Sequence, residues 1–77
     1  MTTDILIDKL RDYFKKKGEA MNVAVHYMED WFSGKDDTFG VICYTRIGDA
    51  MPKGRGQTSQ EALDDLYEKL KAKKIID

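Results

Sequence analysis

Hydrophobic residues recur at helical spacing near both ends of the chain. The residues with this spacing are Leu6, Leu10, Tyr13 and Phe14 in the first segment and Ala62, Leu63, Leu66, Tyr67 and Leu70 in the second. Such a stripe is typical of a helix that buries one face. The pattern therefore predicts one amphipathic helix from Asp4 to Lys17 and another from Ser59 to about Lys73.

The residues that flank both segments also favour helices. Lys15-Lys16-Lys17 places positive charge at the negative end of the first helix dipole, and Gly18 suits the left-handed residue that closes a helix. Before the last helix, Thr58 and Glu61 have the spacing of a capping box, in which each side chain accepts an unpaired backbone N–H. This motif predicts that the helix begins near Ser59.

Between the helices the hydrophobic period changes to two, which is typical of strands. A strand is predicted within 21–32, a second over 38–48, and a short third from Met51 to Arg55, where Pro52 favours an edge position. Glu29 interrupts the first alternation. Either the strand has a bulge there, or it ends near Met28 and Trp31-Phe32 folds back over an edge of the core. Ser33 to Asp37 supplies turn formers between the first two strands.

The expected architecture is a single α+β domain over residues 1–77, in the order α-β-β-β-α. Burying both apolar helix stripes against one another requires the helices to share one face of a three-stranded antiparallel sheet. The other face is then left for solvent or for a partner.

Composition narrows the class of protein. With 42% hydrophobic and 35% charged residues, the chain fits neither a disordered segment nor a membrane span. A net charge of −1 removes the bulk electrostatic argument for nucleic acid, although a local basic patch remains compatible with it. The single Cys43 forms no internal disulfide, and the amino terminus shows no signal peptide, so we expect a cytoplasmic protein that does not bind membranes.

Catalytic chemistry finds little support. The chain has one histidine and one cysteine, and strand alternation puts Cys43 on the core face and His26 on the opposite face. The acidic pairs are adjacent in sequence, so their side chains diverge. We therefore predict a non-enzymatic protein with no catalytic residues, no metal and no cofactor.

The outer face of the predicted sheet is the leading candidate for a binding site. Its members are His26, Met28, Ile42, Tyr44 and Arg46, which together are less polar than an ordinary free surface. They predict contact with a protein partner or with a second copy of the chain, unless a register shift or bulge hides part of the set.

The alternative is nucleic-acid binding, which is disfavoured by the overall charge. It would use the cations Lys15, Lys16, Lys17, Lys53 and Arg55. The segment from Lys53 to Thr58 reads either as a plain turn into the last helix or as a contact for phosphate or an acidic partner.

Two resemblances follow from these patterns. The element order resembles the double-stranded-RNA-binding domain over nearly the whole chain, and that likeness implies RNA contacts from the first helix, the loop between the first two strands and the start of the last helix. Here Ser59-Gln60-Glu61 stands where that family has lysines. The stretch from Gly56 to Leu63 resembles the HicB-type antitoxin domain and small phage proteins. This likeness implies a compact, non-enzymatic partner protein encoded by a phage or another mobile element.

Overall fold

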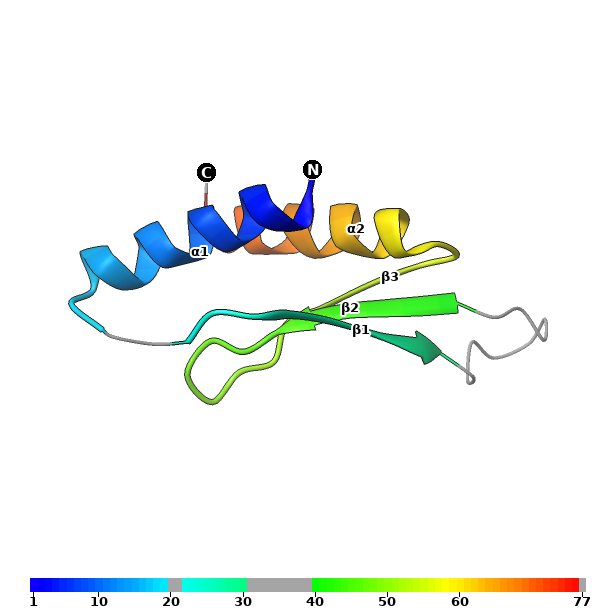
Figure 1. The fold of residues 1–77 in the computed structure, drawn as a ribbon, viewed down its shortest axis with the longest axis horizontal. Coiled ribbons are helices and arrows are strands. Elements are labelled where there is room, and N and C mark those ends of the chain that lie inside the picture. The colour runs from blue at the N-terminus through cyan, green and yellow to red at the C-terminus, as the bar shows by residue number, and fades with distance from the viewer. Residues whose placement is uncertain (20–21, 31–39, 77) are drawn as a thin grey trace.

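The computed structural model describes residues 1–19, 22–30 and 40–76 and has the order α-β-β-β-α. The elements are α1 (Thr3–Lys16), β1 (Val25–Asp30), β2 (Gly40–Thr45), β3 (Lys53–Gly56) and α2 (Ser59–Ala72). The three strands form one antiparallel sheet in the order β1-β2-β3. Both helices lie on the same side of this sheet (Figure 1). The predicted fold class is confirmed.

The first strand is regular through the position where the sequence breaks its alternation. Glu29 pairs with Val41 and Asp30 with Gly40 in an uninterrupted antiparallel register with β2. Neither a bulge at Glu29 nor an end near Met28 is present, so that part of the prediction is wrong. The pairing with β2 keeps the strand extended where the side-chain pattern alone indicated a break. The predictions for Trp31-Phe32 and for the turn at 33–37 lie outside the described residues.

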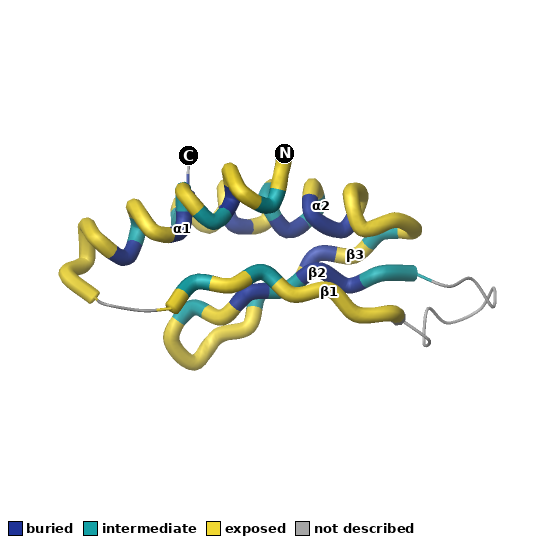
Figure 2. The backbone as a smooth tube through the Cα atoms, in the orientation of Figure 1, coloured by how far each residue is buried: buried dark blue, intermediate teal, exposed yellow. Residues whose placement is uncertain are grey.

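The hydrophobic core lies between the helices and the sheet (Figure 2). Its buried members are Leu6, Leu10, Phe14, Cys43, Ala62, Leu63, Leu66, Leu70 and Ile76. On β2 the alternation sends Val41, Cys43 and Thr45 towards this core. The buried Thr45 hydroxyl donates to the Ala24 carbonyl at 2.7 Å, which removes the cost of an unpaired polar group.

Glycines on β3 allow α2 to lie directly on the strand backbone. A Cβ atom at Gly54 would stand 2.2 Å from the Leu66 nitrogen and 2.3 Å from the Ala62 oxygen. At Gly56 a Cβ would stand 2.7 Å from the Ala62 nitrogen. A side chain at either position would collide with α2, so the two glycines of the Gly-x-Gly sequence allow the helix to pack closely on β3.

Both helices end in the same hydrogen-bonded motif. After α1, Gly18 N–H donates to the Lys15 carbonyl and Glu19 N–H to the Phe14 carbonyl, each at 3.0 Å, with Gly18 at φ 70° as predicted. After α2, Lys74 takes the equivalent position at φ 59°, and its N–H donates to Lys71. A lysine therefore occupies a left-handed conformation that favours glycine.

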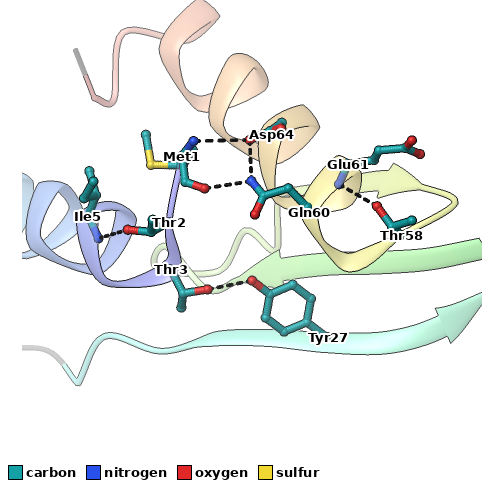
Figure 3. Close-up of polar contacts among 9 residues, drawn as sticks. All are labelled: Met1, Thr2, Thr3, Ile5, Tyr27, Thr58, Gln60, Glu61 and Asp64. Carbon is teal, nitrogen blue, oxygen red and sulfur yellow. Dashed lines mark hydrogen bonds and ion pairs between the residues drawn. The ribbon is translucent and has the colours of Figure 1, made fainter.

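The amino-terminal ends of the helices are capped by threonines and joined to their neighbours (Figure 3). Thr58 Oγ1 accepts the Glu61 N–H at 3.2 Å, as predicted, while the Glu61 carboxylate accepts the N–H of Gln57 at 2.9 Å. The Thr3 and Tyr27 hydroxyls are 2.7 Å apart, which links α1 to β1. Gln60 Nε2 donates to the Met1 carbonyl at 2.7 Å and links α2 to the start of α1.

Candidate binding face of the sheet

The sheet face turned away from the helices carries two rows of side chains that cross the three strands. Because Val41, Cys43 and Thr45 face the core, their neighbours on β2 face the other way. The register places His26, Tyr44 and Lys53 in one row and Met28, Ile42 and Arg55 in the next. We call these six residues the open face. No described helix covers it (Figure 1).

The first row contains a pair of stacked aromatic rings. The His26 and Tyr44 rings lie with centroids 5.1 Å apart and planes inclined by 23°. His26 is exposed and Tyr44 is half-buried, so part of this pair is accessible to solvent. Stacked rings lose little conformational freedom when a partner binds, because each already occupies a restrained position.

The second row has a buried centre. Ile42 is only 5% exposed, although it lies on the face opposite the core. Met28 on one flank is 49% exposed, and Arg55 on the other is also exposed. The predicted contact residue Ile42 is therefore hardly accessible, and the accessible side chains of this row are those of Met28 and Arg55.

Lys53 and Arg55 join the open face, a grouping that the sequence analysis did not make. The sequence left these cations either in a plain turn into the last helix or in a contact for phosphate or an acidic partner, and in both readings they were separate from the sheet patch. The structure shows them on β3, where Lys53 pairs with Tyr44 and Arg55 with Ile42. The signal was present in the alternation Lys-Gly-Arg-Gly, which sends glycines to one side and cations to the other.

Arg46 lies just beyond β2 and is held by the following turn. Its Nε donates to the Gly48 carbonyl at 3.0 Å, and Gly48 has φ 61°. Arg46 is exposed and stands beside the open face without belonging to its rows.

The remaining predicted cations lie in the other layer of the molecule. Lys15 and Lys16 are in the last turn of α1, and the Lys17 ammonium lies 4.7 Å above the Tyr13 ring. The contact with Tyr13 raises the pKa of Lys17. Lys16 lines a cavity of about 250 Å³ with Lys9 and Lys74. The structure thus separates these lysines from Lys53 and Arg55.

The single cysteine and the single histidine face opposite sides of the sheet. Cys43 is fully buried in the core, and burial raises the pKa of its thiol, which disfavours the reactive thiolate. His26 stacks on Tyr44 on the open face. Nowhere in residues 1–19, 22–30 and 40–76 do three or more potential metal ligands gather.

Comparison with known protein families, curated proteins and solved structures finds no match to this chain. Among the described residues, neither helix has the length and apolar character needed to cross a membrane.

Proposed function

We propose that this chain is a small non-enzymatic binding module that contacts an acidic surface of a protein partner through the open face. The observation that carries the proposal is the row of His26, Tyr44 and Lys53 across three strands, beside Met28 and Arg55. Tyrosine, methionine and arginine are enriched where proteins meet. Lys53 and Arg55 supply positive charge to the open face.

A phage or mobile-element origin and a cytoplasmic location belong to the same proposal. The resemblance of Gly56 to Leu63 to small phage proteins supports the origin. The lone free Cys43 agrees with a reducing compartment.

The test compares capture of host proteins by two charge-matched double variants. Lys53→Glu with Arg55→Glu reverses two charges on the open face, and Lys15→Glu with Lys16→Glu makes the same change at the end of α1. We expect the wild-type chain and the α1 variant to retain the same proteins, identified by mass spectrometry, and the open-face variant to lose them. Retention should also weaken as salt is raised. Equal retention by all three proteins would contradict the proposal.

A further control addresses the aromatic row. Tyr44→Ser removes the ring without changing charge, and circular dichroism checks that the fold is kept. Ile42 is left intact because a polar group at this buried position would destabilise the sheet itself.

Nucleic acid is the second candidate partner, favoured by the position of Lys53 and Arg55 on one exposed face. Gel-shift titration with duplex RNA, duplex DNA and single strands decides between the candidates. The partner would be a nucleic acid, and not a protein, if the chain binds one of these probes, the Lys53→Glu and Arg55→Glu variant does not, and nuclease treatment removes the captured material.

A further inference from the structure

The two edges of the sheet differ in how their backbone groups are satisfied. At the β3 edge, α2 supplies partners from one turn of helix. Asp65 Oδ2 accepts the Arg55 N–H at 2.9 Å, and Lys69 Nζ donates to the Lys53 carbonyl at 3.2 Å. Asp65 and Lys69 also pair with each other at 2.8 Å. Two outward groups of β3, the Arg55 N–H and the Lys53 carbonyl, are therefore occupied by the molecule's own side chains.

The β3 edge also has other features that prevent a further strand from pairing. It is four residues long, Pro52 precedes it, and it contains Lys53 and Arg55. Short length, proline and positive charge are the devices by which natural sheets protect their edges. This edge is closed.

The β1 edge shows a different arrangement. The Thr45 N–H donates to the Pro52 carbonyl at 3.4 Å, so this end of β2 directs its odd-numbered residues towards β3 and its even-numbered residues towards β1. His26 and Met28 then bond to β2, and the backbone groups of Val25, Tyr27 and Glu29 point outward. Among the described strands, β1 pairs with β2 alone.

The side chains of β1 also leave its edge accessible. Tyr27 is 38% exposed on the core side and Met28 is 49% exposed on the open face. The strand from Val25 to Asp30 contains no proline, lysine or arginine. Among the described side chains of β1, only Glu29 carries a charge of the kind that disfavours pairing of an edge with another strand.

We propose that β1 pairs antiparallel with β1 of a second copy of this chain, giving a two-fold dimer with a continuous six-stranded sheet. Antiparallel pairing of identical strands is self-complementary and closes the assembly at two copies. Side chains on paired residues must share a face, so the register keeps odd positions opposite odd ones. The register with Tyr27 opposite its own copy places Val25 opposite Glu29 and His26 opposite Met28. It keeps the two Glu29 carboxylates apart, which a pairing centred on Glu29 would not.

The two-fold axis of such a pairing is perpendicular to the sheet. Both α1 helices then lie on one side of the joined sheet, and both open faces lie on the other. A six-residue strand buries less area than a standard interface of about 1,600 Å², so we expect association in the micromolar range rather than a permanent dimer. This dimer does not depend on what the open face binds.

The test is sedimentation velocity over protein concentrations from about 1 µM to about 500 µM, where association of this strength is detected. Glu29→Pro removes an outward N–H and places a ring on the edge, while the bonds from His26 and Met28 to β2 remain. Glu29→Ala keeps the N–H and is the matched control. We expect wild type and Glu29→Ala to dimerise, and Glu29→Pro to dimerise at least about tenfold more weakly.

A second measurement on the wild-type chain avoids any effect of proline on folding. Amide hydrogen exchange at Val25, Tyr27 and Glu29 should slow more steeply with concentration than exchange at His26 and Met28, whose N–H groups are already bonded to β2 and gain only from the added stability of the folded state. A wild-type chain that stays monomeric at about 500 µM would overturn the proposal, because a dimer with a micromolar dissociation constant would be populated at that concentration. So would dimerisation that Tyr44→Ser abolishes and Glu29→Pro leaves intact, because the open face would then be the interface.

Discussion

At Gly54 the backbone of β3 lies so close to α2 that no side chain fits between them. A Cβ there would stand 2.2 Å from the Leu66 nitrogen and 2.3 Å from the Ala62 oxygen, and because both of these atoms belong to the backbone of α2, neither can rotate away. We expect Gly54→Ala to lower the free energy of unfolding by about 3 kcal/mol, the upper range for an overpacked core.

Urea unfolding at pH 7 measures this effect. Lys53→Ala is the control, because its exposed side chain points away from α2 and only its carbonyl bonds to Lys69. That variant should change stability by less than about 0.5 kcal/mol. Equal effects of the two substitutions would contradict the close approach of helix and strand.

Lys74 is the only described non-glycine residue with positive φ, at 59°. A side chain in this conformation is strained, and glycine relieves the strain at some cost in unfolded-state entropy. We expect Lys74→Gly to raise the free energy of unfolding by about 0.5 to 1 kcal/mol. Gly18 ends α1 in the same motif, with no atom within 4 Å of an added Cβ.

Gly18→Ala serves as the opposite change at the equivalent position of the other helix. It should destabilise the protein by about 1 kcal/mol through backbone strain alone. Thermal and urea unfolding of both variants check the pair. A lower free energy of unfolding in Lys74→Gly would contradict this prediction, because it would show that the Lys74 side chain stabilises the fold by more than its backbone strain destabilises it.

At the scale of elements, α2 holds β3 through the Asp65 carboxylate, which accepts from Lys69 and from the Arg55 N–H. The bond from Lys69 has the largest effect and the bond from the Arg55 N–H the next largest. Together they lower the pKa of Asp65 below its ordinary value of 3.8. A carboxyl whose pKa is lowered by folding stabilises the folded state above that ordinary value, and the stabilisation is lost as the pH falls through the lowered pKa.

We expect Asp65→Asn to lower the free energy of unfolding by about 1 kcal/mol at pH 7, since the carboxylate is partly exposed and solvent weakens its bonds. The difference from wild type should shrink as the pH falls below 3.8 and through the lowered pKa of Asp65, because the native carboxyl then becomes protonated as well. Asp8→Asn is the control, because Asp8 forms a 3.7 Å ion pair with Arg11 on the surface of α1. A difference that stays constant with pH would contradict the role of the charge.

Element positions were predictable because each helix carries its own signals. Thr58, Gly18 and the apolar stripes act within a few residues, so α1 and α2 begin and end close to the predicted limits. The regular pairing of Glu29 with Val41 was not predictable. Strand register depends on a partner distant in sequence, and a single charged residue cannot report it.

At the scale of the whole molecule, the proposed dimer links stability to protein concentration. A ligand that binds only the folded state raises its stability, and here the ligand is a second copy. We expect the midpoint of thermal unfolding to rise by a few degrees between about 5 µM and about 500 µM for the wild-type chain, and to stay constant for Glu29→Pro. Differential scanning calorimetry at the two concentrations measures the shift. A concentration-independent midpoint in the wild type would count against edge pairing.

The candidate site was predictable in part. Alternation along β1 and β2 correctly put His26, Met28, Tyr44 and Ile42 on one side of the sheet. It could not show that Ile42 is buried there, nor that Lys53 and Arg55 complete the same rows, because both facts depend on which strands are neighbours.

The sequence by itself determined the two amphipathic helices, the caps formed by Thr58 and Gly18, the three strands and the sides on which side chains alternate. These properties arise from interactions between residues close together in the chain. Only the tertiary structure decided that α2 lies directly on the glycines of β3 and closes that edge with Asp65 and Lys69, while no described element closes the edge of β1. That difference depends on distances between segments far apart in sequence, which local periodicity does not encode.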